Sequence, residues 1–213
     1  MILGLKPAHI DHFDNERHIL PSSVFVATRK FLHNIQSVMD KGFANDPTVR
    51  WYSQAPEVFA NEHHRYVELC ANPAFEHRGV HATANFEGAA IWYPPSVSVS
   101  DVDYEEFKQT VQFPQRLGKL GEIAEACDQY RPAGPHWTLE LIAIDPAVQN
   151  NGIGGKLMAF GLAQCDRSRL AAYLASSNSA NLSFYERLGF TQISEVSEPG
   201  LPTMYPMIRQ PKT

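Results

Sequence analysis

The sequence predicts a mixed α/β or α+β fold, with one sheet flanked by helices. A continuous apolar run from Leu139 to Ile144, interrupted only by Glu140, is typical of a buried strand that ends at Asp145-Pro146. A glycine-rich turn and a segment with helical apolar spacing follow it directly. Elsewhere strands alternate with helices, and several strands join through tight turns. Without internal repeats or linkers, we expect one domain over residues 24–213 after an extension, residues 1–23.

Short apolar and β-branched segments predict the strands of the sheet. They lie at Val24–Thr28, Glu76–Ala84, Asn85–Tyr93, Leu139–Ile144, Leu170–Ala175, Thr191–Val196 and Thr203–Arg209. Apolar residues at helical spacing predict helices before the central strand, at Arg29–Phe43, Pro56–Ala71 and Val102–Tyr130. The triplet Asn45-Asp46-Pro47 predicts a turn after the first of these helices.

Composition narrows the class of protein. The 213 residues carry a formal net charge of −5 and no basic run, which argues against a nucleic-acid partner. No apolar segment approaches the roughly 20 residues that span a bilayer, and the first residues lack an apolar signal core. The cysteines, Cys70, Cys127 and Cys165, are far apart and odd in number, so we expect free thiols. We therefore expect a soluble cytoplasmic protein, a monomer or a homodimer.

The segment QNNGIGGK, residues 149–156, lies between the central strand and the helix that follows it. Such a unit forms an anion site, because backbone N–H groups are free at a helix start and glycines let a phosphate approach the main chain. A P-loop would need glycine at Asn150 and Ser or Thr at Leu157. A dinucleotide fingerprint would need glycine at Leu157 and usually opens a domain. The remaining pattern, Q/R-x-x-G-x-G/A, is satisfied from Gln149 to Gly154.

This loop resembles the pyrophosphate loop of the GCN5-related N-acetyltransferases (GNAT), which binds acetyl-coenzyme A. A second stretch agrees with it, because the ending FYERLGF places Tyr185 shortly before Gly189-Phe190, downstream of two asparagines. The resemblance covers roughly Val24–Arg209. Its layout is closest to the puromycin N-acetyltransferase-like branch, with FANDPTVRW early and GAAIWYPP in the middle.

The resemblance implies a mostly antiparallel sheet that splays between its fourth and fifth strands, Leu139–Ile144 and Leu170–Ala175. The splay leaves backbone groups unpaired, and the amide-bearing pantetheine arm of acetyl-coenzyme A can satisfy them like an added strand. The implied cofactor-binding residues are Ile142, Ala143, Ile144, Gln149, Asn150, Asn151, Gly152, Ile153, Gly154, Gly155, Lys156, Asn178, Asn181 and Tyr185. Asn178 also suits a helix cap, which is an open alternative.

Two residues are candidates for proton transfer. Glu140 is a lone carboxylate in an apolar strand, and burial raises the pKa of a carboxylate and makes it a better base, acting directly or through water. A structural ion pair or an outward orientation are its alternatives. The resemblance places the Tyr185 hydroxyl near the thioester sulfur, where a phenol can protonate the departing thiolate. The alternative for Tyr185 is a core tyrosine.

Phe43, Trp92 and His136 are the candidates for binding the acceptor. Phe43 follows an amphipathic helix that lines the acceptor pocket in related enzymes, and a purely structural role in the core is equally open. Periodicity does not fix which side of the sheet Trp92 or His81 faces. The pair His63-His64 lacks metal-ligand spacing and is expected to be solvated on a helix, and no metal is expected.

The sequence thus predicts an N-acetyltransferase that moves acetyl from acetyl-coenzyme A to a primary amine, by direct attack and without a covalent enzyme intermediate. The acceptor expected from the resemblance is a small molecule. Acetylation of a protein N-terminus or lysine is one alternative, and a non-catalytic acyl-coenzyme A-binding protein that tolerates loss of Glu140 and Tyr185 is another. No Ser–His–Asp grouping with a nucleophile elbow supports a hydrolase.

Overall fold

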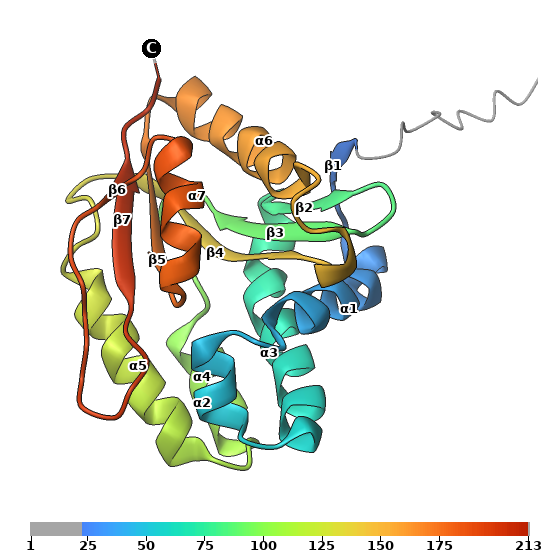
Figure 1. The fold of residues 1–213 in the computed structure, drawn as a ribbon, viewed down its shortest axis with the longest axis vertical. Helices are drawn as coiled ribbons and strands as arrows, with labels where there is room; N and C mark the ends of the chain where they lie inside the picture. The colour runs from blue at the N-terminus through green and yellow to red at the C-terminus, as the bar shows by residue number, and fades with distance from the viewer. Residues whose placement is uncertain (1–22, 213) are drawn as a thin grey trace, which may run out of the picture.

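A seven-stranded sheet forms the centre of the protein, whose computed structural model describes residues 23–212 (Figure 1). The strand order is β1-β2-β3-β4-β5-β7-β6. The strands are β1 (Val24–Val26), β2 (Val80–Thr83), β3 (Gly88–Tyr93), β4 (His136–Ile144), β5 (Ala171–Ser176), β6 (Thr191–Gln192) and β7 (Tyr205–Arg209). Neighbours run antiparallel, except that β4 and β5 are parallel. The predicted mixed, mostly antiparallel sheet is confirmed, while the extension expected at residues 1–23 lies outside the described residues except for Ser23.

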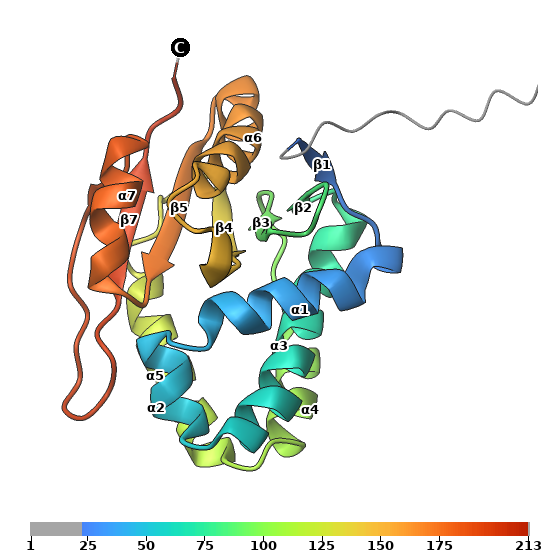
Figure 2. The same ribbon diagram turned by 45° about the vertical axis from the view of Figure 1, so that its right-hand side comes forward.

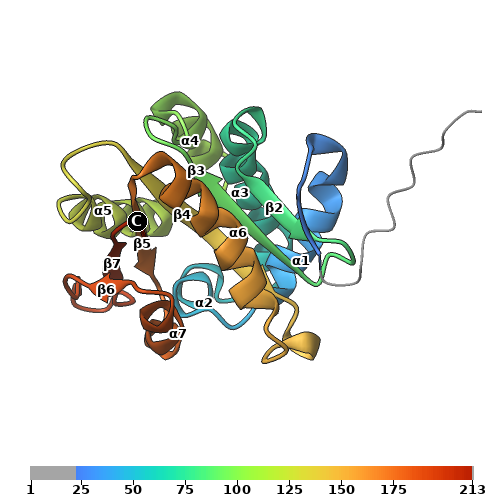
Figure 3. The same ribbon diagram turned by 90° about the horizontal axis from the view of Figure 1, so that it is seen from above.

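Helices cover both faces of this sheet. They are α1 (Leu32–Phe43), α2 (Pro47–Ser53), α3 (Pro56–Glu76), α4 (Asp101–Gln109), α5 (Pro114–Asp128), α6 (Ile153–Ser168) and α7 (Leu182–Arg187), with short 3-10 turns at Arg29–Phe31, Pro146–Val148 and Ser179–Asn181. α1 and α3 bury Ile35 and Val67 against Ile91 on one face. On the other face, α6 buries Leu157 against Trp92 and lies across β3 and β4 (Figure 3). The two faces therefore have separate apolar cores.

β4 and β5 pair along a short stretch only. Within residues 23–212 the register joins His136–Thr138 to Ala171–Tyr173, and no pairing between the two strands follows. Figure 2 shows the two arrows separating toward α1 and α2. β4 stays paired with β3 along its other edge as far as Ile144. One edge of β4 is therefore open toward β5 from Leu139 onward, which confirms the predicted splay between the fourth and fifth strands.

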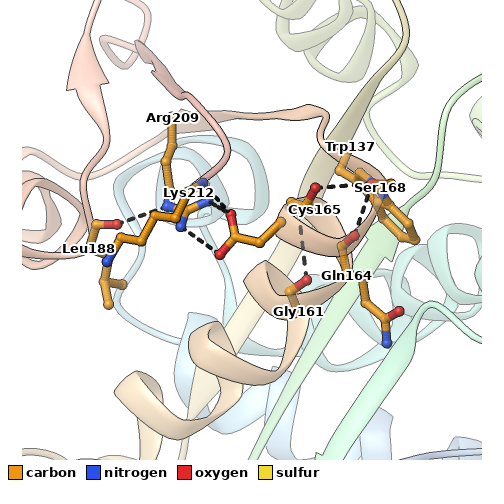
Figure 4. A network of polar contacts seen from close by, with 9 residues as sticks. Trp137, Gly161, Gln164, Cys165, Ser168, Leu188, Arg209 and Lys212 are labelled. Atoms are coloured by element: carbon orange, nitrogen blue, oxygen red, sulfur yellow. Dashed lines mark hydrogen bonds and ion pairs between the residues drawn. The ribbon is translucent and has the colours of Figure 1, made fainter.

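The end at which the strands still pair is held by a polar network (Figure 4). Arg209 of β7 donates two hydrogen bonds to the Asp166 carboxylate of α6, at 2.8 and 2.9 Å, and its Nε donates to the Leu188 carbonyl at 3.1 Å. Ser168 at the end of α6 accepts a hydrogen bond from Trp137 Nε1 of β4 at 3.0 Å. The same helix end is thus bonded to strands on both sides of the splay.

β4 also contains a bulge at Glu140. Ile91 of β3 lies opposite Leu141 and Trp92 lies opposite Leu139, so Glu140 has no partner on β3. Residues two apart in a regular strand share a face, and a bulge breaks this rule. Accordingly Leu139 packs with Trp92 beneath α6, whereas Leu141 packs with Ile91 on the side of α1 and α3.

The single helix predicted at Val102–Tyr130 was wrong, because the chain forms two helices there, α4 and α5. Residues 110–113 separate them, and Pro114 occupies the first turn of α5. Proline has no N–H to donate and disfavours helical backbone in the residue before it, so a helix ends ahead of it. The apolar spacing continues across this break, which explains the prediction.

The triplet predicted as a turn starts a helix that the sequence analysis missed. The Asp46 carboxylate accepts hydrogen bonds from the backbone N–H groups of Thr48 and Val49, at 2.9 and 3.2 Å, and Pro47 follows as the first residue of α2. This is a regular helix N-cap. α3 also runs five residues beyond its predicted end at Ala71, to Glu76, so β2 is shorter than the strand predicted at Glu76–Ala84.

The strand predicted at Thr191–Val196 is interrupted. β6 consists of Thr191 and Gln192, and Val196 forms an isolated bridge with Met204. The bounds of the other strands also differ from the predicted ones. All seven predicted strands are present, but the prediction of their lengths was wrong.

We expect replacement of the buried Arg209 to destabilise the fold. Arg209→Met removes one partner of a pair whose arginine side chain is 3% exposed, and the free energy of unfolding should fall by about 3 kcal/mol. Lys108→Met removes an exposed pair with Glu105 and should cost about 0.5 kcal/mol. Urea denaturation of both variants measures the difference, and equal losses would contradict the role given to Arg209.

Candidate active site

A cleft of about 320 Å³ occupies the gap between β4 and β5. From the two strands it is lined by Thr138, Leu139, Glu140, Leu141, Ile142, Tyr173, Leu174, Ala175 and Ser176. Its other walls include Asn181 and Tyr185, from the turn and helix after β5, and Phe43 from the end of α1. The cleft therefore follows the open edge of β4, whose backbone groups have no partner on β5.

A second, larger cavity of about 660 Å³ lies next to the cleft, among α2, α3, α4 and α5. Six aromatic side chains line it, namely Tyr52, Phe59, Tyr66, Tyr93, Tyr104 and Phe107. Carboxylates also line it, namely Glu62, Asp101, Glu125, Asp128 and Glu140, with Arg131 as the guanidinium among them. An apolar wall with an excess of negative charge favours a ligand that combines an apolar group with a cation.

Glu140 lines both the cleft and the cavity, at the bulge where β4 has no partner on β3. Burial raises the pKa of its carboxyl, with Arg131 opposing the shift and Asp128 adding to it. Burial and the charge of Glu140 together raise the pKa of the Cys70 thiol, so these two residues are neighbours. No hydrogen bond to the Glu140 carboxylate is formed within residues 23–212. The geometry therefore suits a group that exchanges protons with a ligand at the junction of the two spaces.

Tyr185 lines the wall of the cleft from α7. Its ring is 6% exposed and packs against Phe184 and Phe190, with ring centroids at 5.3 and 6.0 Å. Burial, and then the negative charge of Asp46, raise the pKa of its hydroxyl. The hydroxyl is therefore held in its protonated form, the form that donates a proton.

The glycine loop leads from β4 into α6. Gly152 has a φ of +77° and forms the N-cap of α6, and Asn150 also has a positive φ of 66°. A Cβ placed on Gly152 or on Gly155 would meet nothing within 4 Å, so the space over the loop is open. Gln149 donates from its side chain to the Ile144 carbonyl at 3.4 Å. The open loop and the free N–H groups at the start of a 16-residue helix are features that suit an anion.

The other residues predicted to bind the cofactor lie around the cleft and the glycine loop. Ile142 lines the cleft, while Ala143 is buried and Ile144 is partly buried at the end of β4. Asn151 is exposed on the loop. The predicted residues Ile153 and Gly154 begin α6, where Ile153 is buried, and Lys156 is exposed in the first turn of this helix.

The two asparagines after β5 differ in their surroundings. Asn181 lines the cleft. The Asn178 side chain accepts a hydrogen bond from the Ala180 N–H at 3.0 Å, and Asn178 is not among the residues that line the cleft or the cavity. The capping alternative is thus the role that the structure gives to Asn178.

Of the three predicted acceptor residues, Phe43 alone lies at the cleft. Trp92 is fully buried beneath α6, so close to Gly161 that a Cβ there would come within 2.4 Å of the indole, and this corrects its assignment to the acceptor wall. His136 lines neither space and donates from Nδ1 to the Gly134 carbonyl, 2.8 Å away. His81 faces α6 against Phe160, and burial lowers its pKa to about 4.

His63 is the residue that the sequence analysis misjudged. The prediction that it is solvated was wrong, because it is 7% exposed and lines both the cleft and the cavity. It shares one face of α3 with Phe59, Tyr66 and Cys70, at spacings of four, three and seven residues. This spacing was the available signal, although it does not tell a ligand-facing stripe from a core stripe.

Other kinds of site find no support in the part of the chain that the structure describes. Residues 23–212 contain no group of three or more potential metal ligands. In the same residues no helix combines the length and the apolar character needed to cross a membrane. The three cysteines are buried free thiols.

Comparison with known proteins agrees with the features above. Residues 116–192 match the family model of the Acetyltransferase (GNAT) domain. A segment of 78 residues is 36% identical to the mycothiol acetyltransferase of Gordonia bronchialis, covering 31% of this chain. The match spans a quarter, 25%, of the length of that relative.

Solved acetyltransferase structures share the fold over most of their length. The structure of histone acetyltransferase HPA2 and related acetyltransferase from Corynebacterium glutamicum has a TM-score of 0.66 and 22% identity, covering 90% of this chain and 97% of that one. Arylalkylamine N-acetyltransferase 2 from Aedes aegypti has a TM-score of 0.64 and 10% identity, with coverages of 89% and 99%. An agmatine N-acetyltransferase has a TM-score of 0.62 and 12% identity, with coverages of 88% and 98%. The fold is that of the GNAT superfamily.

Because of Glu140, the free energy of unfolding should decrease as pH rises. Its pKa is higher in the folded state than the ordinary value of 4.5, so its favourable contribution is complete below that value and is lost as pH rises through the folded pKa. Glu140→Gln should therefore melt at a higher temperature than the parent at pH 8 and at nearly the same temperature at pH 4. Thermal melts across this range measure the effect, with the exposed Glu198→Gln as the control. A lower melting temperature for Glu140→Gln at pH 8 would contradict it.

Proposed function

We propose that this protein is an acetyl-coenzyme A-dependent N-acetyltransferase that acts on a small primary amine with an apolar or aromatic group. The observation that carries the proposal is the meeting of two spaces at Glu140, a cleft along the open edge of β4 and an aromatic, acidic cavity. The match of residues 116–192 to the GNAT domain supports it independently.

The cleft and the glycine loop suit the two halves of acetyl-coenzyme A. The pantetheine arm would lie along β4, where its amides pair with the free backbone groups of Ile142 and its neighbours. Its pyrophosphate would bind the N–H groups from Gly152 to Gly155, with the Lys156 ammonium in the first turn of α6 close by. Asn181, which lines the cleft, is suited to bond an amide of the arm. No metal enters this proposal.

The chemistry follows from the groups at the junction. The amine nitrogen attacks the thioester carbonyl carbon, and the C–S bond breaks with its electron pair passing to sulfur. Glu140, with a pKa raised by burial, removes a proton from the nitrogen directly or through water. Tyr185, protonated and at the cleft wall, donates a proton to the thiolate. No covalent enzyme intermediate is required.

The lining of the larger cavity supports a small acceptor over a protein. Six aromatic rings surround a volume of about 660 Å³, within the usual size of a small-molecule site. The carboxylates on the same wall attract a cationic amine. Acetylation of a protein N-terminus or lysine would need an open groove and is the weaker proposal. The similar structures include an agmatine N-acetyltransferase and an arylalkylamine N-acetyltransferase, and these amines fit the same acceptor class.

Three narrower proposals rest on the sequence alone. They are the placement in the puromycin N-acetyltransferase-like branch, a cytoplasmic location, and a monomeric or homodimeric state. The roles proposed for the site residues do not depend on them.

The direct test measures binding and turnover separately. Calorimetry with acetyl-coenzyme A should show one site per chain. A panel of phenethylamine, tryptamine, agmatine and a lysine-containing peptide should then show thiol release from acetyl-coenzyme A with the small aromatic amines first. Binding without turnover of any amine would favour the non-catalytic alternative, and absence of binding would reject the proposal.

A side chain at Gly152 should weaken cofactor binding. Gly152→Ala places a Cβ in the left-handed region, at a strain of roughly 1 kcal/mol, and in the open space over the loop. The affinity for acetyl-coenzyme A should fall about tenfold, or 1.4 kcal/mol. Gly200→Ala is the matched control, because Gly200 has nearly the same φ of +79° and equally open surroundings, in a turn before β7. Equal affinity losses in both variants would contradict a phosphate site at the loop.

The two proton-transfer residues should affect turnover rather than cofactor binding. We expect Glu140→Gln and Tyr185→Phe each to lower kcat by about 10²-fold, the usual contribution of a general acid or base. The dissociation constant of acetyl-coenzyme A should change less than threefold in either variant. Steady-state kinetics with the best amine of the panel, together with calorimetry, measure both quantities. Unchanged kcat in both variants would remove these roles while leaving the fold assignment intact.

A further inference from the structure

Asp40 of α1 joins two consecutive histidines of α3. Its carboxylate oxygens lie 2.6 Å from His63 Nδ1 and 2.9 Å from His64 Nδ1. Burial raises the pKa of Asp40, but the hydrogen bonds from His63 and His64 outweigh it and hold that pKa below its ordinary value. Asp40 is therefore a carboxylate, and it accepts a hydrogen bond from each ring.

The two histidines differ in what their other edges face. His63 lines the cleft and the cavity, whereas His64 lines neither, and its side chain is 33% exposed. The His63 ring stacks on Phe59 at 4.8 Å and lies 5.4 Å from Phe43, so its orientation is fixed from two sides. Asp40 keeps the proton of His63 on Nδ1.

The lone pair of His63 therefore lies on Nε2. No hydrogen bond to Nε2 is formed within residues 23–212, and Nε2 is not among the fully enclosed polar atoms. The lone pair is thus available to a molecule in the cavity. A base oriented by a carboxylate through its second nitrogen is the arrangement that activates histidine in many enzymes.

The proposed reaction needs more than one proton acceptor. A primary amine with a pKa near 10 enters as an ammonium ion and leaves as a neutral amide, so its nitrogen loses two protons. One proton must leave before attack, since the ammonium has no lone pair, and the other leaves after the N–C bond forms. Glu140 accounts for one of these transfers.

We propose that His63 Nε2 accepts the proton of the arriving ammonium and that Asp40 is the positioning residue for it. This inference rests on the proposed acetyltransferase function. The ammonium gives its proton to Nε2, and the neutral amine attacks the acetyl thioester carbon. The second proton passes to Glu140, and the thiolate takes a proton from Tyr185. Glu140 then gives its proton back to the Tyr185 phenolate through solvent, and imidazolium returns its proton to water. Acetyl-coenzyme A and the amine supply every atom of the amide and the free thiol.

Several charged or titratable groups lie against this ring or line the same two spaces with it. Asp40 comes from α1, with His33 behind it at 6.0 Å from the His64 ring. The groups that share the linings are Glu62 and Tyr66 of α3, Asp46 before α2, Asp128 and Arg131 at and beyond the end of α5, and Glu140 of β4. The positive charge formed on His63 thus has carboxylates on more than one side.

The test compares the same substitution at two consecutive histidines, of which only His63 lines the cavity. In His63→Asn the side-chain amide can keep the hydrogen bond to Asp40 but has no basic nitrogen toward the cavity, and His64→Asn makes the same change outside it. With phenethylamine and acetyl-coenzyme A, kcat/KM of His63→Asn should fall about 10²-fold, and its pH profile should differ from that of the parent. His64→Asn should stay within twofold of the parent at every pH, and both should bind acetyl-coenzyme A normally.

A parent-like rate and pH profile in His63→Asn, or an equal loss in His64→Asn, would overturn the inference while leaving the proposed function in place. Lack of turnover of every amine by the parent would instead reject the proposed function, and this inference with it. Nuclear magnetic resonance of the histidine rings in the unaltered protein needs no variant to fold. Phenethylamine should shift the His63 ring signals and not those of His64, and an unshifted His63 would equally overturn the proposal.

Discussion

The unpaired edge of β4 is the constraint on which the rest of the structure depends. Each buried backbone group without a partner costs about 1–3 kcal/mol, and β4 leaves its edge open from Leu139 onward. This cost is sustained because the other end of the gap is fixed, by Arg209 on Asp166 and by Trp137 on Ser168. A ligand with amides at regular intervals can complete this edge, so binding affinity and fold stability are linked through the same backbone groups.

The bulge at Glu140 converts this opening into a possible reaction site. Without the extra residue, Leu139 and Leu141 would share a face, and Glu140 would lie on the opposite one. With it, each leucine enters a different core, and the carboxylate reaches the junction of the cleft and the cavity. Bulges of this kind are common beside active sites for this reason. Burial of a carboxylate without a partner is unfavourable for stability, which is typical of functional groups.

Local sequence patterns predicted the helices, strands and loop whose conformation depends on neighbouring residues. They did not predict which side chains are buried or which way they face, because contacts with distant residues determine this. The strand, glycine loop and helix from Leu139 through α6 follow from apolar spacing and backbone freedom. The side of the sheet that Trp92 faces depends on registry with α6, where Gly161 leaves room for the indole. The burial of His63 depends on α1, which brings Asp40 and Phe43 against it. The break before Pro114 was readable from proline itself, and the apolar spacing concealed it.

The two proposed proton acceptors are supported by different physical effects, and this difference argues for separate roles. Glu140 has no hydrogen-bond partner in residues 23–212. Burial, with a smaller effect from the charge of Asp128, favours its protonated form and makes it a ready acceptor late in the reaction. His63 has a fixed carboxylate behind it, which stabilises the cation that forms when a charged amine first arrives. A single group tuned in one way would serve one of these steps well and the other poorly. An acidic cavity that attracts ammonium therefore benefits from a separate group that removes its charge, since a retained ammonium cannot attack the thioester.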